Sequence, residues 1–352
     1  MRLRPADIPF HKKWDIEINM NIKRELEKFG LASQKRFSQN FLNSESISEQ
    51  IVSRAKIDPT DIVIEIGTGL GILTASLAKR AAKVITFEID KGLILKMSSF
   101  LPVGSNIELI SADFLKCDLT ELQRKYSKVK VVSNLPFHIS KEVMFKLFEH
   151  RKWIETMTLM FQKDVPERIV SKPQSKEYGI LSVIARINSD PKIVLSLSPD
   201  KFYPSPDVSA AVVYFQMKRE LVIDERHELF FIDCVKSAFG QRRKMLFNSL
   251  QKVASSEVLK EAGTNCGIDF RRRGLRSLTR KIRRWSSGSL RACGRNRPPT
   301  AKRPICWAWR TFFCTILINP SRCSTRASPV KRGLGSRRRG WTVCTGAGGP
   351  AP

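Results

Sequence analysis

Residues 271–352 of this chain contain no Asp, Glu or Tyr, although they hold 21 Lys and Arg, 18 of them Arg. The whole chain of 352 residues has 62 basic and 33 acidic side chains and a formal net charge of +29, so +21 falls in this segment and +8 in residues 1–270. The segments 1–270 and 271–352 therefore differ sharply in composition. The basic excess favours a polyanionic partner, nucleic acid first and an anionic membrane surface second.

Long apolar runs and clustered cysteines are also missing. No run approaches the roughly 18 apolar residues of a membrane-spanning helix. The eight cysteines form no C-x-x-C pair and no Cys/His cluster, so we expect no metal site. The first residues lack the apolar core of a signal peptide, and the acids Asp7, Asp15 and Glu17 are unlike a mitochondrial presequence. We expect a cytoplasmic protein without a membrane span.

Short β-rich runs alternate with helical patterns between about residues 44 and 215. The strands are expected at Ile62–Ile66, Val84–Ile89, Ile107–Ile110, Val129–Val132, Thr156–Phe161, Ile193–Leu197 and Ala211–Phe215. This alternation is typical of a parallel sheet with helices on both faces, so we predict an α/β, Rossmann-like domain with a mostly parallel seven-stranded sheet. After about Glu220 apolar residues recur at helical spacing, which predicts a small C-terminal helical domain whose last helix runs to Glu261, with Gly263 as its C-cap.

Three consecutive strand ends carry candidate ligand-binding residues. The first strand runs into the turn Gly67–Gly71, where glycines let a ligand approach the backbone and the following helix offers free N–H groups. Its G-x-G-x-G spacing differs from the G-x-G-x-x-G of dinucleotide sites. Glu88 ends the second strand, where an acid accepts hydrogen bonds from ribose hydroxyls, and Asp113 follows the third, near an adenine amino group. The sequence thus predicts a cofactor that contains adenosine.

The fourth strand ends in Ser133-Asn-Leu-Pro-Phe-His-Ile-Ser140. An adenine amino nitrogen is a poor nucleophile because its lone pair is delocalised into the ring. The Asn134 side-chain oxygen and the Leu135 carbonyl can accept hydrogen bonds from its two N–H groups. Pro136 stiffens the turn, and Phe137 offers a ring on which a flipped base stacks. Such acceptors favour electrostatic stabilisation over general-base catalysis.

These motifs resemble those of the KsgA-type rRNA adenine N6,N6-dimethyltransferases in their order and approximate spacing. The resemblance covers about residues 30–270. It rests on Lys35–Leu42 (KRFSQNFL), the glycine motif at 64–74, Glu88, Asp113, Asn134–Phe137, Phe202–Val208 (FYPSPDV) and Phe239–Leu250 (FGQRRKMLFNSL).

The resemblance implies a class I methyltransferase domain at 31–217, after an N-terminal extension at 1–30, and a helical RNA-binding domain at 222–270. It implies S-adenosylmethionine as the cofactor. The residues implied to bind it are Asn40, Leu42, Gly67, Gly69, Glu88, Asp113 and Asn134. The catalytic residues implied are Asn134, Leu135, Pro136 and Phe137.

The resemblance further implies the target. Family members methylate the N6 amino groups of two adjacent adenosines in the 3′-terminal hairpin loop of small-subunit (16S) rRNA, giving N6,N6-dimethyladenosine in pre-30S particles during ribosome biogenesis. We expect a monomer. Basic residues that would position the RNA through its phosphates are Lys35, Arg36, Arg242, Arg243 and Lys244.

Two alternatives for the function remain open. Macrolide-resistance-type methyltransferases of large-subunit (23S) rRNA share the Gln-Asn-Phe-Leu and glycine motifs, although the helix that begins at Gln241 favours the small-subunit group. A non-catalytic assembly or nucleic-acid-binding factor on the same fold is the other. The intact motif Asn134–Phe137 opposes it, whereas the altered C-terminal region keeps it open.

Residues 271–352 do not continue the family pattern. Relatives carry an Arg-Ala-Glu-Glu-Leu-Ser-like turn and a final helix after the position of Gly267-Ile-Asp269, and neither occurs here, so the helical domain is truncated. An acid-free segment rich in Arg, Gly, Pro, Cys and Trp suggests a frame-shifted translation. A disordered, basic RNA-binding tail is the alternative interpretation.

Overall fold

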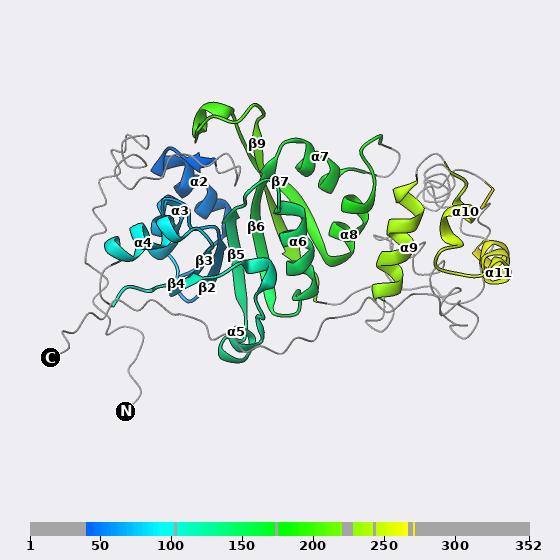
Figure 1. Ribbon diagram of the computed structural model, residues 1–352, viewed down its shortest axis with the longest axis horizontal. Helices are drawn as coiled ribbons and strands as arrows, with labels where there is room; N and C mark the ends of the chain where they lie inside the picture. Colours follow the sequence, from blue (N-terminus) through cyan, green and yellow to red (C-terminus); the bar gives the residue numbers. More distant parts are fainter. Residues whose placement is uncertain are drawn as a thin grey trace. The chain divides into compact units, whose positions relative to one another are not determined.

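The structure is a computed structural model that describes residues 40–101, 104–172, 175–219, 228–241, 244–266 and 270–271. Seven strands form one sheet in the order β4-β3-β2-β5-β6-β9-β7 (Figure 1). Their bounds are β2 Ile62–Ile66, β3 Lys83–Glu88, β4 Ile107–Ser111, β5 Val129–Asn134, β6 Ile154–Gln162, β7 Ser189–Leu197 and β9 Ala210–Met217. Every strand predicted from the sequence is present, with ends that differ by a few residues. The predicted seven-stranded α/β fold is confirmed.

The order of the strands creates a switch point between β2 and β5. β2 pairs in parallel with β3, and β3 with β4, before the chain returns to the other side of β2 as β5. β5 then pairs in parallel with β6. In open α/β sheets, ligands bind in the crevice at the carboxyl ends of the strands where the order reverses. The glycine turn follows β2 and the motif that begins at Asn134 follows β5, so both predicted motifs lie at this point.

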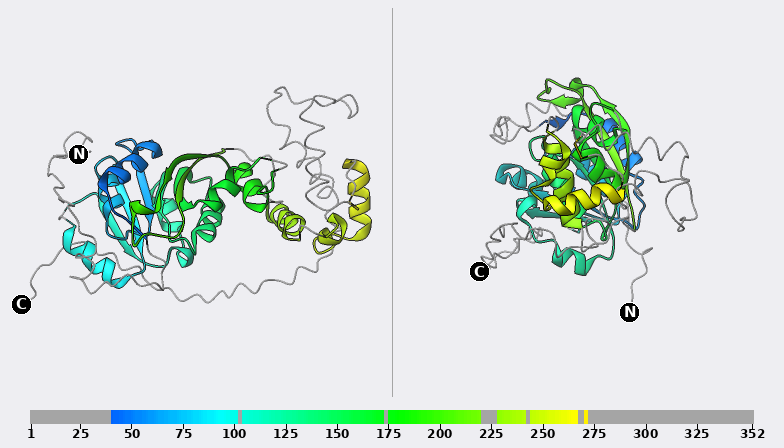
Figure 2. Two further views of the ribbon diagram at one scale, coloured as in Figure 1. Left: turned by 90° about the horizontal axis from the view of Figure 1, so that it is seen from above. Right: turned by 90° about the vertical axis from the view of Figure 1, so that its right-hand side faces the viewer.

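Helices connect the strands and cover the sheet. Figure 1 and Figure 2 show α2 and α3 beside β2 and β3. The helices are α2 Glu45–Ala55, α3 Ile72–Ala78, α4 Lys91–Phe100, α5 Thr120–Lys125, α6 Ser140–Glu149, α7 Asp164–Val170, α8 Ile180–Asn188, α9 Glu228–Gly240, α10 Leu246–Leu250 and α11 Ser256–Cys266, and the 3₁₀ turns are η3 Phe114–Lys116 and η4 Pro199–Lys201. A separate two-stranded antiparallel sheet joins β1 Phe41–Leu42 to β8 Phe202–Tyr203.

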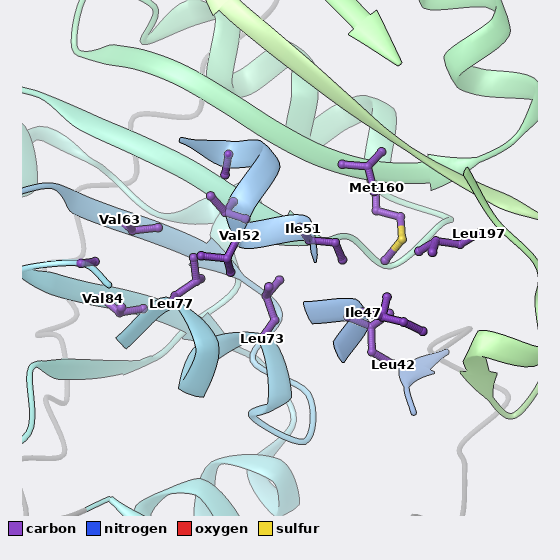
Figure 3. Close-up of a cluster of buried hydrophobic side chains, with 14 of the residues drawn as sticks. Leu42, Ile47, Ile51, Val52, Val63, Leu73, Leu77, Val84, Met160 and Leu197 are labelled. Carbon is purple, nitrogen blue, oxygen red and sulfur yellow. The ribbon is translucent and has the colours of Figure 1, made fainter. Parts of the chain in front are cut away.

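The main apolar cluster fixes α2 and α3 against one face of the sheet (Figure 3). Ile51 and Val52 of α2 and Leu77 of α3 pack in this cluster with Val63 of β2 and Val84 of β3. Side chains alternate between the faces of a strand, and the residues that follow these valines, Ile64 and Ile85, are also fully buried. Both faces of the sheet are therefore covered, as expected for a parallel sheet.

The C-terminal helices differ from the sequence prediction at one point. Helix α11 continues through Gly263 to Cys266, so the prediction that Gly263 ends this helix was wrong. A glycine inside a helix costs only about 1 kcal/mol relative to alanine. Val258, Leu259 and Ala262 are buried and hold the helix in place, and the Thr264 hydroxyl donates to the Lys260 carbonyl one turn earlier, at 3.1 Å.

Contacts divide the described chain into two compact units, residues 40–163 with 194–214 and residues 164–193 with 215–271. In the second unit, the rings of Tyr178 and Phe239 meet edge to face with centroids 5.9 Å apart. No helix among the described residues is long and apolar enough to cross a membrane. The sequence-based division into domains at 31–217 and 222–270 stays a prediction.

Candidate active site

The glycine turn after β2 is closely packed on two sides. Gly67 and Gly69 have φ angles of 83° and 55°, in the left-handed region that favours glycine. A Cβ at Gly67 would lie 3.7 Å from Cδ of Pro136, and one at Gly69 would lie 3.2 Å from the ring of Phe41. The turn thus fits between the motif after β5 and strand β1, and a side chain at Gly69 would require the Phe41 ring to shift.

Glu88, at the end of β3, holds this turn in place. One carboxylate oxygen accepts the backbone N–H of Gly69 at 3.1 Å, and the other accepts those of Ile89 and Asp90 at 2.8 and 3.0 Å. Burial raises the pKa of Glu88, while these three backbone bonds oppose that effect. A carboxylate has about four lone-pair sites, so one site remains for a hydroxyl of a ligand.

Asp113 lies where β4 passes into η3. Its Oδ1 accepts the Leu115 N–H at 3.0 Å, and its Oδ2 lies 3.5 Å from the exposed Lys116 ammonium. The next residue, Phe114, is buried and packs edge to face on Phe87, with centroids 5.2 Å apart. The packing of Phe114 therefore fixes the backbone next to this carboxylate, and the carboxylate itself is partly exposed to solvent.

The motif after β5 is held by contacts at both ends. The Asn134 Nδ2 donates to the carbonyl of Asn40 at 3.1 Å, which leaves its Oδ1 as an acceptor for another group. Leu135 is buried, and Phe137 packs against the main apolar cluster while remaining partly exposed. The Ser140 hydroxyl donates to the Phe137 carbonyl at 3.0 Å and joins the motif to helix α6.

Strand β1 is held over the glycine turn by β8. Phe41 pairs with Tyr203 and Leu42 with Phe202. Asn43 extends this pairing, because its Nδ2 donates to the Asp200 carbonyl at 2.6 Å. The motif Phe202–Val208 recognised in the sequence thus supports the segment that the resemblance places on the cofactor.

The ends of strands β2 to β5 and the segment of β1 border one pocket of about 240 Å³ in the first unit. The structure brings together every residue predicted to bind the cofactor or to act in catalysis. They are Asn40, Leu42, Gly67, Gly69, Glu88, Asp113, Asn134, Leu135, Pro136 and Phe137. Their individual roles remain predictions.

Glu65 also lines this pocket, and the sequence analysis missed it. It is fully buried in β2 and accepts hydrogen bonds from the hydroxyls of Thr74 and Thr86 on Oε2, at 2.6 and 2.8 Å. Its Oε1 has no hydrogen-bond partner in the described part of the chain. Burial raises the pKa of Glu65 to about 8. A charged residue within the apolar strand Ile62–Ile66 is the signal that would have identified it, because charged side chains are seldom fully buried.

Four of the five predicted RNA-contacting residues, Lys35, Arg36, Arg242 and Arg243, lie outside the described residues. Lys244 is described and exposed, and it lies four positions after α9 ends at Gly240. Its contact with RNA stays a prediction. Among the described residues no group of three or more His, Cys, Asp or Glu side chains has the arrangement of a metal site.

Known proteins match this chain over most of its length. The family profile of ribosomal RNA adenine dimethylase matches residues 30–272. The ribosomal RNA small subunit methyltransferase A of Clostridium botulinum (strain Kyoto / Type A2) is 36% identical over 256 residues, which cover 72% of this chain and 93% of that protein. The protein of the same name from Bacillus mycoides is 36% identical over 269 residues, or 74% of this chain and 92% of the relative.

Solved structures support the same fold. A dimethyladenosine transferase from Plasmodium falciparum has a TM-score of 0.54 at 24% identity, covering 81% of this chain and 91% of that one. The 23S rRNA methyltransferase ErmE has a TM-score of 0.51 at 22% identity, covering 78% and 98%. Since the profile spans more than half of the chain and the relatives exceed 30% identity, this chain belongs to the ribosomal RNA adenine dimethylase family of methyltransferases.

Proposed function

We propose that this enzyme transfers methyl groups from S-adenosylmethionine to the N6 amino groups of two adjacent adenosines in the 3′-terminal hairpin loop of small-subunit rRNA. The observation that carries the proposal is the single pocket that joins the glycine turn, two strand-end acids and the Asn134–Phe137 motif. Both relatives reported above are named small-subunit methyltransferases, which favours the small-subunit target.

The residues of the pocket suit the proposed cofactor. Glu88 has a free lone pair for a ribose hydroxyl, and Asp113 has a partly exposed carboxylate for an amino group of adenine. The partnerless Oε1 of Glu65 is a buried acceptor that suits the ammonium group of the methionine part. When bound, S-adenosylmethionine supplies an electrophilic methyl group on its sulfonium.

Asn134 and Phe137 would prepare the target adenine. Because the Nδ2 of Asn134 is engaged with the Asn40 carbonyl, its Oδ1 is directed to accept an N–H of the amino group. When this N–H turns out of the plane of the adenine ring, the nitrogen becomes pyramidal. Its lone pair is then less delocalised into the ring and is available to attack the methyl group. The ring of Phe137 stacks on the flipped base and stabilises the positive charge that develops on it. No general base is required, because the methylated amine is acidic enough to lose its proton to water.

A transfer assay tests this function. Purified enzyme, labelled S-adenosylmethionine and immature small subunits from a strain without this methylation should give label in the 3′-terminal hairpin, located by mass spectrometry of rRNA fragments. The Asn134→Ala variant is the matched negative control. Label in large-subunit rRNA would instead support the macrolide-resistance type. Cofactor binding without any transfer would support a non-catalytic assembly factor.

We further propose that the working enzyme is a monomer that acts on pre-30S particles, with the helical region at 222–270 contributing to RNA binding. Sedimentation of the enzyme alone and with these particles measures both points.

The family match ends at residue 272, close to the change of composition at residue 271. This agreement supports the interpretation of 271–352 as a frame-shifted segment. Detection of a native peptide that contains Trp307–Trp309 would refute that interpretation.

A further inference from the structure

Lys146 of α6 holds the backbone of the turn that follows Asp113. The turn η3 has only three residues, and within it the Phe114 carbonyl accepts the Cys117 N–H at 3.3 Å. The Lys146 ammonium donates to the carbonyls of Phe114, Leu115 and Cys117, at 2.7, 3.0 and 2.6 Å. An ammonium has three protons, so Lys146 uses all of them on this turn.

The same ammonium also lies over the aromatic ring of Phe114. Its nitrogen is 5.2 Å from the centroid of the Phe114 ring, within the range of a cation–π contact. Phe114 in turn packs on Phe87, and both rings line the pocket. The Asp113 carboxylate accepts the Leu115 N–H, and Lys146 donates to the Leu115 carbonyl, so both side chains hold the same residue of the turn.

Helix α6 connects this turn to the motif that faces the target base. Its first residue, Ser140, donates to the Phe137 carbonyl, and Lys146 follows six positions later, about 9 Å along the helix axis. One rigid helix therefore sets the spacing between the acceptors for the target amine and the Asp113 carboxylate. We propose that Lys146 is a positioning residue that fixes the Asp113 turn for recognition of the adenine of the cofactor.

This inference rests on the proposed function, because it takes adenine as the ligand of Asp113. It predicts a specific defect in adenine recognition. A site that hydrogen-bonds an amino group discriminates against an analogue without it by about tenfold or more. S-Inosylhomocysteine, which has an oxygen in place of the adenine amino group, is such an analogue of S-adenosylhomocysteine.

Calorimetric titration of the full chain with both compounds provides the test. The native protein should bind S-adenosylhomocysteine at least about tenfold more tightly than S-inosylhomocysteine. In Lys146→Met this ratio should fall to about two, because the adenosyl compound loses affinity and the inosyl compound does not. In the transfer assay the KM for S-adenosylmethionine should rise while kcat changes by less than about twofold.

Lys141 on the first turn of α6 provides the matched control. Its side chain makes no hydrogen bond or ion pair among the described residues, so Lys141→Met should keep the native ratio. Lys146→Met that lowers the unfolding temperature but keeps the ratio would overturn the proposal. If Lys146→Met does not fold, Lys146→Arg decides, since a planar guanidinium does not reproduce the three converging N–H groups of an ammonium. An unchanged ratio in the arginine variant would also overturn it.

Asp113→Asn separates this proposal from the proposed function. If Asp113→Asn leaves the ratio of the two affinities unchanged, the assignment of adenine to Asp113 fails. If Asp113→Asn removes the discrimination and the Lys146 variants do not, only the positioning role of Lys146 fails.

Discussion

Exchange of Glu65 for glutamine tests whether cofactor binding is linked to the loss of a proton from a buried carboxyl. Burial raises the pKa of Glu65 to about 8, and the hydrogen bonds from Thr74 and Thr86 counteract burial only in part. At pH 7 about nine tenths of this carboxyl is therefore protonated in the free protein. A ligand ammonium beside Oε1 favours the ionised form, so binding should expel the proton.

The size of the effect follows from this pKa. If Glu65 is ionised in the complex, the association constant should rise about 25-fold between pH 6 and pH 7.5. Glu65→Gln has no proton to lose, so its affinity should stay constant over this range. At pH 7.5 it should bind about tenfold more weakly than the native protein, because a neutral hydrogen bond replaces a charge-assisted one.

Calorimetry measures the proton directly. Titration of S-adenosylhomocysteine at pH 7 in two buffers of different ionisation enthalpy should report release of about 0.9 proton by the native protein and none by Glu65→Gln. His138→Gln is the matched control, because His138 lines the same pocket and its substitution leaves Glu65 unchanged. Equal proton release by the native protein and Glu65→Gln would refute the reasoning.

The same carboxyl should affect the stability of the protein without ligand. The unfolded chain loses this proton near pH 4.5 and the folded protein near pH 8, so the unfolded state is the first to ionise as the pH rises. The free energy of unfolding should therefore decrease between these pH values, by up to about 5 kcal/mol. Urea unfolding at pH 5, 6.5 and 8 should show Glu65→Gln gaining stability relative to the native protein. A constant difference would contradict the buried, protonated state.

Three further substitutions test the pocket and the RNA contact. Asn134→Ala should lower methyl transfer, measured with labelled cofactor, by about 100-fold or more, since it removes a preorganised acceptor. Gly69→Ala places a side chain at φ 55° and against the Phe41 ring, so it should cost more stability in thermal unfolding than Gly104→Ala, whose φ is 79° but whose Cβ would meet nothing within 4 Å. Gly69→Ala should also weaken cofactor binding, and equal effects of the two alanines would contradict the packing of β1 on the turn. Lys244→Gln should weaken RNA binding and lower the slope of log K against log salt by about 1, and an unchanged slope would exclude a phosphate contact.

The strands were predictable because their signals are local. The strand Ile62–Ile66 is apolar apart from Glu65, rich in β-branched residues and bounded by turn residues, and the structure has the same bounds. Gly263 shows the limit of such signals. Its helix-ending tendency is worth about 1 kcal/mol, and burial of neighbouring side chains in α11 outweighs it.

The hydrogen bonds of Glu65, unlike its position in the strand, could not be predicted from local sequence. From the sequence, it is an acid in a strand that precedes a glycine turn. Its properties depend on Thr74 from α3 and Thr86 from β3, which are 9 and 21 positions away and reach it only when the sheet forms. Both hydroxyls donate to Oε2, and Oε1 has no partner among the described residues. This arrangement results from packing, so no spacing rule in the sequence predicts it.

The orientation of Asn134 was unpredictable for a different reason. Its partner is the backbone carbonyl of Asn40, 94 positions earlier, and every residue has a carbonyl. Strand β1 brings this carbonyl to the pocket because it pairs with β8, more than 150 positions later. A substitution at position 40 therefore keeps the acceptor that orients Asn134 and removes only what the Asn40 side chain contributes. By contrast, loss of the pairing between β1 and β8 removes both, so the two contributions of this segment are separable by experiment.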